Sequence, residues 1–101
     1  MAEGRFVVQI GAFASTTGRA QALGQARGRI AGLGKAIPAE ARFVASEGGG
    51  LHRLSIGGFT SRTAAEGACR AIRGTGGACF VRADAGDRPI QWVTRAGDPQ
   101  A

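Results

Sequence analysis

The residue types that most often carry chemistry are sparse in this chain. His52 is the only histidine, Cys69 and Cys79 are the only cysteines, and seven acidic side chains are scattered along 101 residues. Two cysteines and one histidine fall short of a structural zinc site, and no two carboxylates show a pairing suited to glycoside hydrolysis. We therefore expect no catalytic residue, no metal, no cofactor and no enzyme activity. A disulfide between Cys69 and Cys79 stays open, because it requires a Cα–Cα distance below about 7 Å.

Positive charge is the strongest compositional signal. The chain carries 13 basic and 7 acidic side chains, a formal net charge of +6, and Lys35 is its only lysine. The planar guanidinium of arginine suits two-point contacts with carboxylates or phosphates. We therefore expect an acidic partner, which could be nucleic acid, anionic lipid or an acidic polysaccharide. No apolar run approaches the roughly 18 residues of a membrane span, so we expect no membrane insertion by this chain.

Two alternating runs place polar side chains on a common sheet face. In residues 6–10, a strand would point Phe6, Val8 and Ile10 one way and Val7 and Gln9 the other. In residues 51–56, the inner set is His52, Leu54 and Ile56, and the outer set is Leu51, Arg53 and Ser55. We also assign Val81 to the outer face and expect every phenylalanine to lie in the core: Phe6, Phe13, Phe43, Phe59 and Phe80.

These runs belong to an internal repeat, in which residues 9–15 recur as residues 55–61. A helical apolar pattern and a further strand-like segment follow each copy, so two similar units make a pseudo-twofold domain. The order β-α-β-β-α-β predicts an α+β fold, with a four-stranded antiparallel sheet and two helices on one face. We assign residues 1–4 to a linker, 5–83 to the domain and 84–101 to a tail. That tail has a possible extra strand at 90–94, in which Trp92 would cover part of the domain.

Residues 7–15 and 53–61, each with its following helix, resemble the two halves of the SPOR domain family. The resemblance covers residues 5–83 and implies a non-catalytic, monomeric module. Such modules bind peptidoglycan glycan strands stripped of their stem peptides, as amidases leave them at division septa. They sit in the periplasm, within longer exported or membrane-anchored proteins that divide the cell or remodel its wall.

The resemblance also implies a site on the open sheet face. The glycan-binding positions map onto Gln9, Ala12, Arg53 and Val81. Leu51 stands where some members carry an aromatic residue, which predicts weaker sugar stacking. Some members also join the first and last strands by a disulfide, at positions that correspond here to Ile10 and Phe80.

The residue types suit such a ligand. Without its stem peptide, N-acetylmuramic acid exposes a carboxylate that Arg53 could bind, and Gln9 and Ser55 could hydrogen-bond to acetamido and hydroxyl groups. Two alternatives stay open, and the first of them shares the predicted fold. An RNA-recognition module would stack bases on aromatic residues of the central strands, and none is expected on the outer face, so we expect no nucleic-acid partner. A protein adaptor would pair through a sheet edge.

Overall fold

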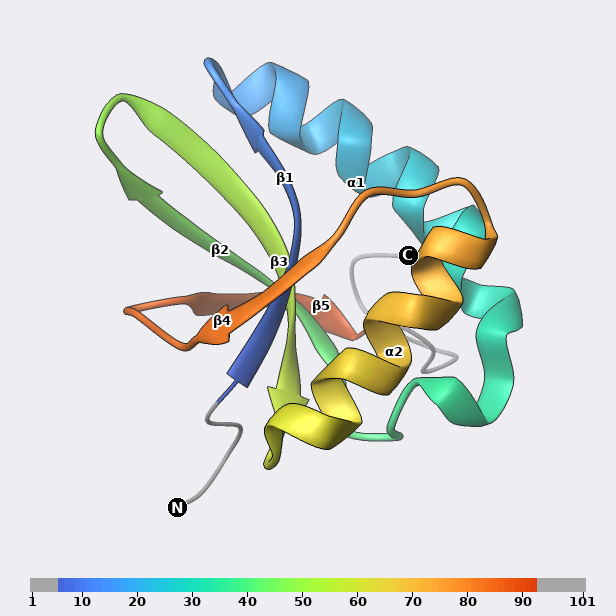
Figure 1. Ribbon diagram of the computed structural model, residues 1–101. Helices are drawn as coiled ribbons and strands as arrows, with labels where there is room; N and C mark the ends of the chain where they lie inside the picture. The colour runs from blue at the N-terminus through green and yellow to red at the C-terminus, as the bar shows by residue number, and fades with distance from the viewer. Residues whose placement is uncertain (1–5, 93–101) are drawn as a thin grey trace.

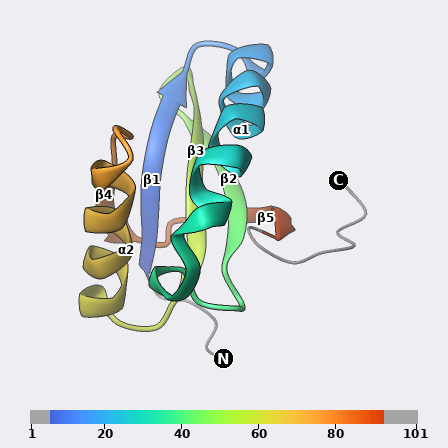
Figure 2. The ribbon, with the colours of Figure 1, turned by 90° about the vertical axis from the view of Figure 1, so that its right-hand side faces the viewer.

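The computed structural model describes residues 6–92, in which one antiparallel sheet is covered on one side by two helices (Figures 1 and 2). The predicted α+β class is confirmed. The elements along the chain are β1 (Phe6–Phe13), α1 (Thr16–Ile30), the 3-10 helix η1 (Ala31–Ala36), β2 (Arg42–Gly48), β3 (Leu51–Phe59), α2 (Arg62–Gly74), β4 (Phe80–Ala83) and β5 (Arg88–Trp92).

The sheet has five strands in the order β4-β1-β3-β2-β5, instead of the four expected. The first four form the predicted βαββαβ sheet, and every neighbouring pair is antiparallel. The fifth strand comes from the segment assigned to the tail, and it pairs with the outer edge of β2. The covering role expected for the Trp92 side chain lies outside the part of the structure that is described.

Equivalent serines of the two repeat copies begin the two helices. The Ser15 hydroxyl accepts a hydrogen bond from the Gly18 N–H at 3.0 Å, and the Ser61 hydroxyl accepts one from the Ala64 N–H at 3.1 Å. Such N-caps satisfy backbone donors that have no partner within the helix. The repeat in the sequence is thus a repeat of strand, cap and helix.

The core lies between the sheet and the helices, and the predicted strand alternation places it correctly. Val8, Leu54 and Ile56 are fully buried in it, and Phe43 and Phe59 join them. The inner stripe of α2 is buried against these strands: Ala65, Ala68, Cys69 and Ile72. His52 lies half-buried on this side, with its Nδ1 3.8 Å from the Glu47 carboxylate, in agreement with its predicted inward direction.

A disulfide ties the second helix to the last segment of the repeat. Cys69 of α2 and Cys79, which directly precedes β4, are bridged with a Cα–Cα distance of 5.7 Å. The possibility left open by the sequence is therefore realised. The bridge also fixes which side of β4 faces the helices, because Cys79 must point toward α2.

We predict that this bridge stabilises the domain measurably. Opening it by the double substitution Cys69→Ser and Cys79→Ser should lower the free energy of unfolding by about 2–3 kcal/mol, as expected for a short closed loop. Urea unfolding followed by circular dichroism measures the difference. An unchanged midpoint would mean that the bridge contributes nothing to the stability of the fold. The double variant also serves as the control for reductant, because it has no bridge to reduce and its midpoint should not change when reductant is added.

Candidate functional site

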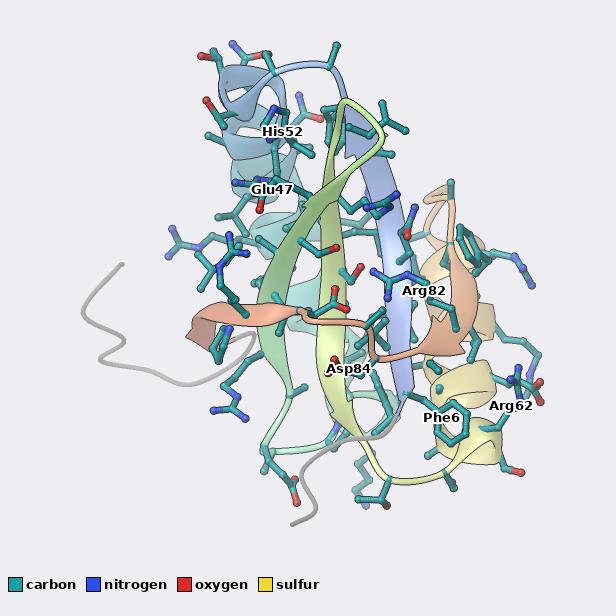
Figure 3. The ribbon with its side chains drawn as sticks, turned by 90° about the vertical axis from the view of Figure 1, so that its left-hand side faces the viewer. Phe6, Glu47, His52, Arg62, Arg82 and Asp84 are labelled. Carbon is teal, nitrogen blue, oxygen red and sulfur yellow. A yellow bond between two sulfur atoms is a disulfide. The ribbon has the colours of Figure 1, made fainter. Side chains whose placement is uncertain are left out.

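The sheet face opposite the helices, called the outer face here, carries the polar side chains of the central strands (Figure 3). Gln9 of β1 lies opposite Ser55 of β3, and Ala12 lies opposite Arg53. The structure thus brings Gln9, Arg53 and Ser55 together on one face, as the sequence predicts. Ala12 and Leu51 lie at the end of this face and are exposed.

The outer face is not open, and this corrects the expectation drawn from the sequence. Residues 84–87, called the crossing segment here, run from β4 at one edge of the sheet to β5 at the other, over the central strands (Figure 3). Under this cover Ser55 is fully buried and Gln9 is 9% exposed. Val7, Val44 and Ser46 are buried on the same face.

The last strand of the repeat faces the opposite way from our prediction. Val81 lies opposite Val8 and packs against the core, so its assignment to the outer face is wrong. Phe80, assigned to the core, lies opposite Gln9 and is 51% exposed. The signal that could have revealed this is Cys79, because a bridge to the inner stripe of α2 forces Phe80 outward. The outer face therefore does carry an aromatic ring, at its β4 edge.

Arg82, which sequence reasoning missed, is the most connected side chain of the outer face. Its Nε donates to Gln9 Oε1 at 2.9 Å, and its Nη2 donates to Ser55 Oγ at 3.4 Å. Nη1 and Nη2 each donate to one carboxylate oxygen of Asp87 at 2.9 Å, and Nη1 also donates to the Ala83 carbonyl at 3.1 Å. All five guanidinium donors are engaged, so Arg82 joins β1, β3, β4 and the crossing segment.

The Asp87 side chain is fully buried. Burial raises the pKa of Asp87, but hydrogen bonds from Arg82, the Ala85 N–H and Ser46, together with the Arg82 charge, outweigh it. The pKa of Asp87 therefore lies below its ordinary value. A two-point arginine–carboxylate contact of this kind is among the stronger hydrogen-bonded pairs in proteins.

Beside the crossing segment the outer face has a hollow of about 330 Å³, called the outer hollow here. Its walls are Gln9, Ser46, Arg53, Phe80, Arg82 and Ala85. Arg53 is partly exposed, and it donates to the Gly48 carbonyl at 3.4 Å. An aromatic ring beside two guanidinium groups and an amide can bind a sugar that carries a carboxylate.

A second hollow of about 400 Å³ lies between α2 and β4 and shares the Phe80 ring as a wall. It is lined by basic side chains of α2, namely Arg62, Arg70 and Arg73. No group of three His, Cys, Asp or Glu side chains within residues 6–92 could hold a metal ion. No helix in that range is both long and apolar enough to cross a membrane.

The fold is that of a small α+β module, with two helices on one face of an antiparallel sheet and polar side chains on the other. The chain belongs to the SPOR domain family, whose model matches residues 2–83. It is also 39% identical over 79 residues to the cell division protein FtsN of Caulobacter vibrioides. The alignment covers 74% of this chain but 28% of that relative. No solved structure gives a significant match.

The buried ion pair predicts a specific pH dependence of stability. Since the pKa of Asp87 is lowered on folding, its carboxylate stabilises the fold above the ordinary value near 4. That contribution is lost as the pH falls through the lowered value. Asp87→Asn should therefore reduce the free energy of unfolding by about 1–3 kcal/mol at neutral pH, and by progressively less below about pH 4.

Urea unfolding of both proteins at neutral and acidic pH measures this difference. Glu40→Gln, which neutralises an exposed carboxylate in the turn before β2, is the matched control and should change little at either pH. An Asp87→Asn deficit of the same size at both pH values would contradict the assignment.

Proposed function

We propose that this domain binds peptidoglycan glycan strands that lack stem peptides, and that it thereby directs a longer periplasmic protein to the division septum. The observation that carries the proposal is the outer hollow, where Arg53, Gln9 and Phe80 converge on one face of a SPOR domain. The chain spans only about a quarter of the FtsN relative. The septal role is therefore proposed for a larger protein of which this domain is the targeting part.

The chemistry of the ligand matches the chemistry of the hollow. Removal of the stem peptide leaves one free carboxylate on each N-acetylmuramic acid, and a guanidinium binds a carboxylate in a charge-assisted, two-point contact. Arg53 is the candidate for that contact, because it lines the hollow and is partly exposed. The net charge of +6 adds a longer-range attraction to a strand of repeated negative charge.

Phe80 supplies the aromatic surface for sugar stacking that Leu51 does not offer. The ring is half exposed on the edge strand, opposite Gln9, and walls the same hollow as Arg53. A sugar can lay its C–H face on this ring while its polar groups reach the amide of Gln9. By contrast, the central strands give no aromatic platform for stacked bases, because their outer positions are Val7, Gln9 and Ala12 of β1 and Leu51, Arg53 and Ser55 of β3.

The test is co-sedimentation with purified sacculi. We expect amidase-treated sacculi to retain the domain and peptide-decorated sacculi not to retain it. Arg53→Glu should weaken retention at least about tenfold, because it places a negative charge where the glycan carboxylate binds. Arg29→Glu, an equal charge reversal at an exposed residue of α1 that does not line the outer hollow, should lower affinity far less. Equal retention on both kinds of sacculi would refute the preference for stripped glycan.

Phe80→Ala isolates the contribution of sugar stacking. Because the ring is half exposed, its removal should change the free energy of unfolding by less than about 1 kcal/mol. Retention on amidase-treated sacculi should fall about three- to tenfold, while Phe80→Trp should preserve it. Unchanged retention of Phe80→Ala would remove the ring from the binding site.

A further inference from the structure

The crossing segment places an acidic side chain of this chain where an acidic ligand would be recognised. Asp87 is held in the plane of the Arg82 guanidinium by two parallel hydrogen bonds of 2.9 Å. Arg82 itself walls the outer hollow, next to Gln9 and Arg53. The guanidinium is therefore shared between the hollow and the crossing segment.

We infer that Arg82, with Ser46 and Ser55, forms a second carboxylate-binding site of the outer hollow, beside Arg53, and that a muramic acid carboxylate of a bound glycan takes this site over from Asp87. This inference rests on the proposed function. The aspartate carboxylate and the lactyl carboxylate of muramic acid are both planar single anions with the same oxygen spacing. Exchanging one for the other keeps the guanidinium paired, and so avoids the large penalty of a buried charge without a partner.

The exchange requires the crossing segment to move away from the outer face. The crossing segment is folded into a turn, in which Asp84 Oδ1 accepts hydrogen bonds from the Gly86 N–H at 3.2 Å and the Asp87 N–H at 3.4 Å. Both of its ends are held in paired strands, β4 on β1 and β5 on β2. Movement of Asp87 away from Arg82 therefore opens this turn and loosens β5 from β2.

The attachment of β5 is suited to such a separation. β5 is a short edge strand that contains Pro89, so it makes few ladder hydrogen bonds to β2. Its Arg88 pairs with Glu47 at 3.0 Å, but the Arg88 side chain is 61% exposed, and exposed ion pairs contribute little. Edge elements of this kind open more readily than the core strands. In the free domain the crossing segment thus covers Gln9 and Ser55, and glycan binding exposes them.

The test titrates free N-acetylmuramic acid into the wild-type domain and into Asp87→Asn, with affinity followed by NMR. Removing the competing carboxylate should raise affinity at least about fivefold, because the Arg82 site is then free for the sugar. The methyl ester of N-acetylmuramic acid, which lacks the charge, should gain nothing, and Glu40→Gln should match the wild type. Equal or weaker binding of the free acid by Asp87→Asn would overturn the inference.

Hydrogen exchange on the unaltered domain gives an independent readout. Saturation with N-acetylmuramic acid should accelerate exchange of the β5 amides while the β1 and β3 amides stay protected, and unchanged or slower exchange in β5 would overturn the inference. Sacculus binding separates the two proposals. If the wild-type domain is retained on amidase-treated sacculi but Asp87→Asn does not bind N-acetylmuramic acid more tightly, the proposed function stands and the carboxylate exchange is refuted. If Asp87→Asn binds the free acid more tightly but the domain is not retained on sacculi, the carboxylate exchange stands and the proposed function is refuted.

Discussion

The ion pair between Arg82 and Asp87 determines what the outer face of this domain presents. It lies over the middle of the sheet, and its guanidinium also holds Gln9 and Ser55. A buried charge pair persists only when every donor and acceptor is satisfied, and here the neighbours of both residues complete the set. The position of the crossing segment, the burial of the central polar residues and the shape of the outer hollow all depend on it.

Much of the fold could be predicted because its determinants are local. The repeated strand alternation and the helical apolar spacing are short-range patterns, and they predict the element order and the inner faces of β1 and β3. The direction of β4 could not be derived in the same way. A four-residue strand with Phe80 and Val81 side by side offers apolar side chains on both faces, and only the long-range bridge from Cys79 decides between them.

The crossing segment escaped prediction for a related reason. Asp84, Gly86, Asp87 and Pro89 have the composition of a linker, and nothing local shows that Asp87 meets an arginine on the preceding strand. Sequence reasoning therefore placed Gln9, Arg53 and Ser55 correctly on one face, but it left that face open and missed Arg82. The structure adds two residues to the walls of the outer hollow that sequence reasoning had not placed there, the Phe80 ring and Arg82, and Arg82 is paired with Asp87.

The most direct test of this account is the crystal structure of the domain bound to a soluble tetrasaccharide of peptidoglycan that lacks stem peptides. The account predicts that the glycan lies in the outer hollow, with a sugar face on Phe80 and hydrogen bonds from Gln9 and Arg53. A glycan bound in the second hollow, between α2 and β4, or on the exposed side of the helices, would contradict it.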